Sequence, residues 1–160
     1  METRLDVSIY RLRELGRTFD IILCLGVYYH LVDPFYAFAQ IRHCCHPNTI
    51  VVLEGIATSA RRRGTMTYDL SNRSARLAPT VTVLNQMLKA TYLDVQRQAW
   101  RRSRGASSWW QRVRTLAGRP AFPPSERLLT VCQPFEGVNA LYFYPPPFDL
   151  HVYDERFRPS

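Results

Sequence analysis

The stretch FDIILCLGVYYHLVDPFYAFAQIR, residues 19–42, decides the fold expected for this chain. Its first seven residues are almost continuously apolar, which is typical of a strand buried on both faces of a parallel sheet. Asp33 and Pro34 then predict the start of a helix, because aspartate caps free N–H groups and proline suits the first helical position. The run TIVVL, residues 49–53, predicts a second buried strand. Strand, helix and strand together predict a βαβ unit of an α/β fold.

The sequence on either side of this unit predicts further elements. Leu5, Val7 and Ile9 alternate with polar residues, which predicts a short strand before a turn at Gly16. Residues 57–78 are polar and have no clear period, so we expect a long surface loop. Thr80 is expected to cap a second helix, in which apolar residues recur at helical spacing.

The C-terminal third has fewer regular patterns. Residues 93–99 are compatible with a strand, and residues 100–124, rich in arginine and tryptophan, are interpreted as an insertion or loop. Residues 128–132 and 140–144 are apolar runs separated by a turn signal. They predict a closing antiparallel pair of strands after the mainly parallel sheet.

The composition is typical of one globular domain, with 160 residues of which 46% are hydrophobic and 21% charged. We expect the domain to cover residues 1–147 and a loosely held tail to cover residues 148–160. No apolar run is long enough to span a bilayer, and the N-terminus lacks the apolar segment of a secretory signal. A cytoplasmic protein without a membrane partner is therefore expected.

The four cysteines, Cys24, Cys44, Cys45 and Cys132, are too few and too unevenly spaced for a disulfide framework, so we expect them to be reduced. The run His43-Cys44-Cys45-His46 contains zinc-compatible side chains. Adjacent residues of one helix point in different directions and cannot close a tetrahedral site together, so no metal site is predicted.

The formal net charge is +8, carried almost entirely by arginine. A positive net charge attracts polyanions such as RNA, but it is also compatible with an ordinary solvated surface. The arginine and tryptophan segment of residues 100–119 leaves the same two readings open: stacking on single-stranded nucleic acid, or packing on the domain.

A site is expected directly after the first buried strand, because ligands of open α/β sheets bind beyond the carboxyl ends of the strands. Gly26 would let the backbone approach a ligand closely. Tyr29 offers a stacking face and a hydroxyl group, and His30 offers a titratable nitrogen. A tight turn with a packed tyrosine is the alternative interpretation.

Residues 19–42 resemble the segment around the fourth strand of class I S-adenosylmethionine-dependent methyltransferases, which often read F-D, an apolar run, and G-V-L-Y-H-L-x-x-P. Residues 8–20, SIYRLRELGRTFD, and residues 78–95, APTVTVLNQMLKATYLDV, resemble two further segments of that family. The pattern is similar above all to tRNA wobble-uridine carboxymethyltransferases and their relatives. The resemblance implies a Rossmann-like methyltransferase fold, S-adenosylmethionine as cofactor, and tRNA or a small molecule as methyl acceptor.

The resemblance also implies site residues. Ser8 and Ile9 stand where the family contacts the adenine, with Asp6 as a rival for that role. Leu25 and Gly26 stand at the methionine side of the cofactor. Tyr29 matches a family tyrosine that helps hold the cofactor, and His30, the candidate catalytic residue, matches the histidine after it.

The sequence departs from the family at its start. The family's first strand and its E/D-x-G-x-G-x-G turn, which wraps the cofactor, have no counterpart here, so the domain is expected to be incomplete at its N-terminus. A sheet that lacks its first strands would expose an apolar edge and face, which predicts a partner chain that covers them. A non-catalytic remnant that binds RNA or protein is the alternative function.

Overall fold

The structure, a computed structural model, describes residues 7–58, 64–72, 75–101, 125–136 and 139. These residues form a four-stranded sheet in the order β1-β2-β6-β5. Its strands are β1 (Phe19–Leu25), β2 (Cys45–Thr58), β5 (Leu93–Arg101) and β6 (Ser125–Pro134). The first predicted strand is thus confirmed in its start and end, and the second is longer than the predicted residues 49–53. The prediction that the first strand is buried on both faces was wrong, because in β1 only Cys24 is buried and the alternate residues Ile21, Leu23 and Leu25 are exposed.

The sheet is mixed, which refines the expected mainly parallel sheet. β1 and β2 are parallel, whereas β6 runs antiparallel to both β2 and β5. The α/β class and antiparallel pairing near the C-terminus are confirmed. The partners of residues 128–132 are β2 and β5, however, and not the predicted residues 140–144. Residues 140–144 and the predicted tail lie outside the described residues, as does most of the predicted insertion, at residues 102–124.

Helix α1 (Pro34–His43) begins where the sequence predicted. Asp33 is the N-cap, and its carboxylate accepts a hydrogen bond of 2.9 Å from the N–H of Tyr36, while Pro34 occupies the first helical position. The helix ends before Pro47, and its N-terminal end lies next to the turn that follows β1. The cap therefore fixes the position of that turn relative to the helix.

Replacing Asp33 with alanine should lower the free energy of unfolding by about 1 kcal/mol, because one N–H of the first turn loses its acceptor. Urea unfolding followed by circular dichroism measures this change. Asp33→Ser is the matched control, since serine also caps helices and should recover most of the loss. Equal stabilities of the alanine and serine variants would contradict the cap.

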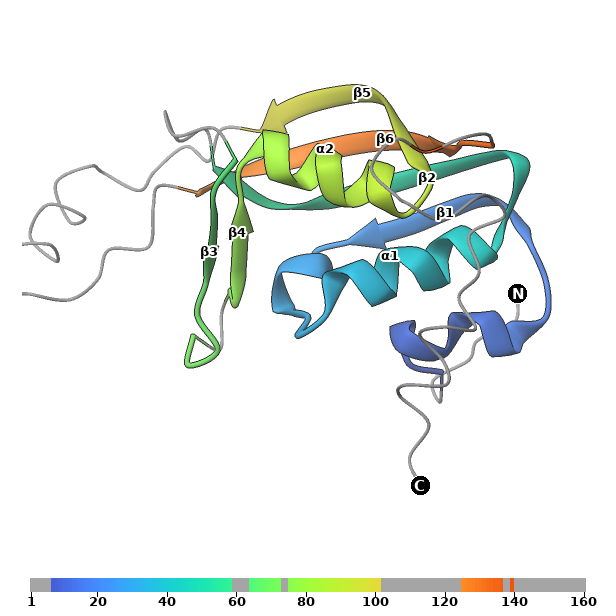
Figure 1. Cartoon of the computed structure of the whole chain (residues 1–160), viewed down its shortest axis with the longest axis horizontal. Coiled ribbons are helices and arrows are strands. Elements are labelled where there is room, and N and C mark those ends of the chain that lie inside the picture. Colours follow the sequence, from blue (N-terminus) through green and yellow to red (C-terminus); the bar gives the residue numbers. More distant parts are fainter. Residues whose placement is uncertain (1–6, 59–63, 73–74, 102–124, 137–138, 140–160) are drawn as a thin grey trace, which may run out of the picture.

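Helix α2 (Val81–Ala90) also begins as predicted, with the N–H of Val83 donating to the hydroxyl oxygen of Thr80 at 3.4 Å. Both helices cover the same face of the sheet (Figure 1), where Phe38 of α1 and Leu84 of α2 join one buried cluster with Leu53 of β2. The sheet and the two helices therefore form two layers with the core between them.

The other face of the sheet carries no helix within the described part of the chain. Alternate residues of β1 point toward it and are exposed: Ile21 by 60%, Leu23 by 63% and Leu25 by 51%. Ile50 of β2 and Leu129 of β6 are exposed as well. This agrees with the apolar edge and face expected from the sequence.

Two predictions about local structure were wrong. Ile9 does not lie in a strand but begins the 3₁₀ helix η1 (Ile9–Leu15), which ends at Gly16 in a left-handed conformation. The N–H of Arg13 donates to the buried side-chain oxygen of Gln40 at 3.0 Å. This contact with α1 shows that tertiary packing overrides the local alternation.

The second wrong prediction concerns the polar segment expected to be a loop. Within it, β3 (Met66–Tyr68) and β4 (Leu77–Pro79) form an antiparallel pair, and β4 is buried. The two strands pair with each other, and contacts with distant residues, such as the hydrogen bond from the Tyr68 hydroxyl group to the Val32 carbonyl oxygen, hold the pair in place. Such contacts leave no local sequence pattern. The pair lies at the carboxyl end of β1, next to the turn described below.

The chain just after α2 contains a left-handed residue that is not glycine. This residue is Tyr92, with φ of 58°. The Thr91 hydroxyl group donates to the carbonyl oxygens of Leu88 and Met87, and Tyr92 is buried and stacks on Phe135. Asn139 donates to the carbonyl oxygen of Lys89 at 2.6 Å. Side-chain contacts thus hold a conformation that glycine adopts more easily.

Candidate cofactor-binding site

The turn after β1 is built around Gly26. Its φ is +72°, a conformation that side chains other than glycine rarely adopt. Its N–H donates to the carbonyl oxygen of Glu54 at 2.8 Å, which joins the turn to β2. A side chain at this position would also lie 3.7 Å from the Tyr29 hydroxyl oxygen. Gly26 therefore forms a left-handed turn at the carboxyl end of β1, and the close approach of a ligand to its backbone stays a prediction.

The two tyrosines of the turn have different surroundings. Tyr28, in the short helix η2 (Tyr28–His30), is buried and donates a hydrogen bond of 2.7 Å to the carbonyl oxygen of Ile56. Its ring meets that of Phe38 edge-on, with centroids 6.0 Å apart. Burial raises the pKa of its hydroxyl group, so Tyr28 stays neutral and serves as a packing residue.

Tyr29 takes part in a polar cluster that sequence reasoning missed. Its ring is 5% exposed, and the Arg127 guanidinium lies 5.2 Å from the ring centroid. Arg127 also donates to both carboxylate oxygens of Glu54, at 3.2 and 2.9 Å. An acid at the end of an apolar strand was the only available signal, because β6 brings Arg127 from 73 residues away.

This cluster restrains the turn from two sides. Arg127 Nη1 donates to both carboxylate oxygens of Glu54, which keeps the guanidinium near the Tyr29 ring, and cation–π attraction adds to ring packing. The cluster combines a charged pair with an aromatic ring at the carboxyl ends of β1 and β2. It fixes the shape of the turn, while the predicted contact of Tyr29 with a cofactor stays a prediction.

His30 and the pair of strands β3 and β4 bound the turn on its outer side. His30 is exposed, and its ring tilts against that of Tyr29 with centroids 4.2 Å apart. The N–H of Arg76 donates to the carbonyl oxygen of Tyr29 at 2.8 Å, and the Arg76 guanidinium donates to that of His30 at 3.5 Å. The imidazole of His30 is therefore available to solvent, whereas its backbone is held.

The predicted adenine contacts lie on η1. The N–H of Tyr10 donates to the Ser8 hydroxyl oxygen, and the Tyr10 hydroxyl oxygen accepts hydrogen bonds of 3.1 Å from the N–H groups of Val32 and Asp33. These contacts bring η1 to the segment after β1. Ser8 is the N-cap of that helix, Ile9 is its first residue and is half-buried, and Asp6 lies outside the described residues.

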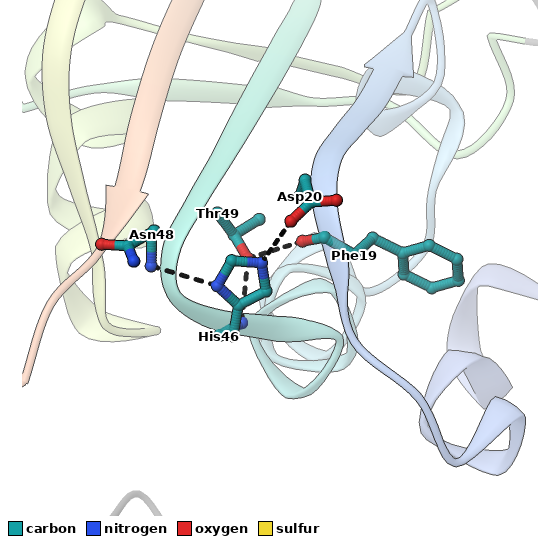
Figure 2. A network of polar contacts seen from close by, with 5 residues as sticks. All are labelled: Phe19, Asp20, His46, Asn48 and Thr49. Carbon is teal, nitrogen blue, oxygen red and sulfur yellow. Dashed lines mark hydrogen bonds and ion pairs between the residues drawn. The ribbon is translucent and has the colours of Figure 1, made fainter.

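A second polar cluster lies at the opposite end of β1 (Figure 2). His46 Nε2 lies 3.0 Å from Asp20 Oδ1, and His46 Nδ1 accepts a hydrogen bond from the N–H of Asn48. The Thr49 hydroxyl group donates to the carbonyl oxygen of Phe19 and accepts from the N–H of His46. The hydroxyl group is thus committed to the backbone, so the cluster fastens the start of β2 to β1.

The cysteines behave as small apolar residues. All four are free and buried, and the Cys44 and Cys45 thiols donate to the carbonyl oxygens of Leu12 and Ile41. The part of the chain that the structure describes contains no group of three metal-compatible side chains. Nor does any described helix have the length and apolar character needed to cross a membrane.

Comparison with solved structures identifies the fold. An O-methyltransferase from a polyketide synthase of Brevibacillus brevis, crystallised with S-adenosylhomocysteine, matches 74% of this chain with 45% of its own, at 12% identity and a TM-score of 0.53. A putative methyltransferase of Bacillus halodurans matches 74% of this chain with 65% of its own, at 10% identity and a TM-score of 0.52. The cyclase SpnF matches 75% with 51% of its own length, at 13% identity and a TM-score of 0.51.

The sequence itself gives no such match. No protein-family model matches the chain, and no curated protein sequence matches it. The chain spans about half the length of the Brevibacillus brevis enzyme and of SpnF. Because one of these neighbours is a cyclase, the fold by itself does not determine the reaction. The described residues thus have the fold of part of a class I methyltransferase domain.

Proposed function

We propose that this chain contributes the carboxyl-terminal half of a methyltransferase domain that binds S-adenosylmethionine. The observation that carries the proposal is the left-handed turn at Gly26, at the carboxyl end of β1, next to the exposed residue Leu25. In open α/β sheets a ligand lies in this place, where the backbone must approach it closely. Leu25, Gly26 and Tyr29 would face the methionine part of the cofactor, and Ser8 and Ile9 its adenine.

Methyl transfer does not require acid–base catalysis by these side chains. The site has to align the acceptor atom with the methyl group and exclude water, and a dedicated base is not required. His30 is the exposed titratable residue of the turn, so it is the candidate for holding an acceptor or its proton. The cofactor, when bound, supplies the methyl group.

Titration with S-adenosylhomocysteine tests the proposal. We expect a dissociation constant of about 0.1–1 mM for the chain alone, about 4–5.5 kcal/mol, because the glycine-rich turn has no counterpart here. Amide chemical shifts in ¹⁵N-labelled protein detect such weak binding, and the largest changes should fall on Gly26 and Tyr29. A folded protein that shows no shift changes in the turn at saturating ligand would contradict the proposal.

Leu25→Asp provides the negative variant. Leu25 is exposed, so the substitution should leave the fold intact while placing a carboxylate beside the ligand, and binding should weaken at least about tenfold. Leu70→Asp is the matched control, because Leu70 is a leucine of similar exposure, 59%, in the turn between β3 and β4. Equal weakening in both variants would mean that the effect is not local.

The methyl acceptor is proposed from the resemblance and the charge. The net charge of +8 suits tRNA, and a small molecule is the other candidate. Binding to tRNA should weaken steeply as salt rises, because phosphate contacts release counterions. Salt-sensitive tRNA binding without any cofactor binding would instead favour the non-catalytic RNA-binding alternative.

A further inference from the structure

Arg76 carries a positive charge that no acid of the described residues neutralises. Its guanidinium donates one hydrogen bond, of 3.5 Å, to the carbonyl oxygen of His30, and makes no ion pair with a described residue. Asp69 lies across the strand pair from Arg76, and its N–H donates to the Arg76 carbonyl oxygen. The Asp69 carboxylate, however, accepts from the N–H and the hydroxyl group of Ser71, at 2.9 and 2.6 Å. Most of the five guanidinium N–H groups are therefore without a partner among the described residues.

Exposed apolar side chains lie near this charge. Tyr68 of β3 donates through its hydroxyl group to the carbonyl oxygen of Val32. This carbonyl group is two residues after that of His30, to which Arg76 donates. Carbonyl groups two residues apart lie within about 7 Å of each other, so the phenol and the guanidinium reach neighbouring positions. Val32 is 57% exposed, Tyr68 40%, and Met66, on the same face of β3 as Tyr68, 43%. Val32, Met66 and Tyr68 are called the β3 rim below.

The charge and the β3 rim lie on the outer side of the turn that contains Gly26. The N–H of Arg76 donates to the carbonyl oxygen of Tyr29 at 2.8 Å, so the start of β4 is fixed to the turn. The exposed imidazole of His30 contacts the Tyr29 ring, and the His30 carbonyl oxygen accepts from the guanidinium. A molecule that contacts both Arg76 and the rim would therefore lie beside His30.

We propose that Arg76 and the β3 rim bind the methyl acceptor, and that this acceptor is a small organic carboxylate with a flat apolar body. A guanidinium donates two parallel hydrogen bonds to a carboxylate, and the apolar body would cover the rim. This inference rests on the proposed function, because it names the acceptor of the same site.

The surroundings of Arg76 favour a carboxylate over other anions. One guanidinium neutralises the single charge of a carboxylate, whereas a phosphate monoester carries a charge of almost −2. A nucleic acid backbone is bound by several positive charges together. The described neighbours of Arg76 are instead the three apolar side chains of the rim, so the small molecule is preferred to tRNA as the acceptor.

Paired titrations with benzoate and benzamide test this site on the full chain. The two probes have the same ring and differ in one charge. We expect a dissociation constant of about 1–10 mM for benzoate and at least about fivefold weaker binding of benzamide. In ¹⁵N-labelled protein the largest shift changes should fall on the amides of His30, Val32, Tyr68 and Arg76. Equal affinity for the two probes would overturn the proposal.

Substitutions separate the contribution of the charge from that of the rim. Arg76→Gln should weaken benzoate binding about fivefold and leave benzamide binding nearly unchanged, whereas Arg76→Lys should lose only part of the affinity. Arg97→Gln is the matched control, because Arg97 is an exposed arginine of β5 outside the site. Val32→Ser should weaken both probes alike, since it removes apolar contact without changing the charge. An equal loss of benzoate binding in the Arg76→Gln and Arg97→Gln variants would contradict the site.

Titration with the cofactor product distinguishes this inference from the proposed function. An acceptor has to be bound together with the cofactor, so saturating S-adenosylhomocysteine should not weaken benzoate binding, and competition between them would overturn the acceptor role. S-adenosylhomocysteine binding without benzoate binding would refute the inference and leave the proposed function standing. Benzoate binding without S-adenosylhomocysteine binding would confirm the anion site and refute the proposed function, and with it the acceptor role.

Discussion

Raising the pH from about 7 to about 10 should lower the free energy of unfolding by about 4 kcal/mol. Burial raises the pKa of the Cys24 and Cys45 thiols to about 11 and that of Cys132 to about 12, from 9.0. Above pH 9 the unfolded chain therefore loses three protons that the folded chain keeps, and Cys44, whose pKa is also raised by burial, can only add to the effect. Rising pH favours the unfolded chain, and each thiol contributes about 1.4 kcal/mol per pH unit until its folded pKa is reached.

Urea unfolding in the presence of a reducing agent, followed by circular dichroism across this pH range, measures the loss. Tyr28, whose pKa is also raised by burial, adds to it only above about pH 10. Cys132→Ala is the control: its stability at pH 7 is lower, but its loss between pH 7 and 10 should be about one third smaller. An unchanged loss would show that the buried thiols are not its cause.

Replacing Gly55 with alanine should lower the free energy of unfolding by about 3 kcal/mol, at the upper end for overpacking. A Cβ atom at Gly55 would lie 2.4 Å from Tyr28 Cε1 and 2.7 Å from Cζ. The ring cannot move aside easily, because it is 1% exposed and its hydroxyl group is bonded to Ile56. Chemical unfolding of the purified variant measures the change.

Two variants separate this packing effect from backbone strain. At Gly16 a Cβ atom meets nothing within 4 Å but φ is +61°, so Gly16→Ala should cost only about 1 kcal/mol. In a Tyr28→Leu background, Gly55→Ala should cost much less than in the native chain, because the clashing ring atoms are gone. A Gly55 variant no less stable than the Gly16 variant would show that the ring yields.

The sequence predicted those parts of the fold that local chemistry determines. The apolar run of β1, the Asp33 cap and the Thr80 cap each depend on residues within a few positions, and all three were found where expected. Ile9 was assigned to a strand wrongly, because its helix depends on contacts with α1 that are distant in sequence. The partner of β6 was missed for the same reason, since strand pairing is nonlocal.

In the site, too, the features that depend on nearby residues could be predicted, and those that depend on distant residues could not. The turn at Gly26 could be predicted, because a glycine directly after an apolar strand indicates a backbone conformation that other residues rarely adopt. The cluster of Tyr29, Glu54 and Arg127 could not, because β6 supplies the arginine and nothing in its own segment marks it. The burial of Tyr29 was the alternative left open by the sequence, and it is what the structure contains.

Among the described strands, β6 comes last in the sequence but lies between β2 and β5 in the sheet, and this has a consequence for synthesis. β6 pairs with both β2 and β5, so neither pairing can be completed until β6 has left the ribosome. Until then β2 has only β1 beside it, and β5 has no partner in this sheet. The nascent chain therefore carries open strand edges until β6 emerges, and unpaired edges of this kind favour aggregation.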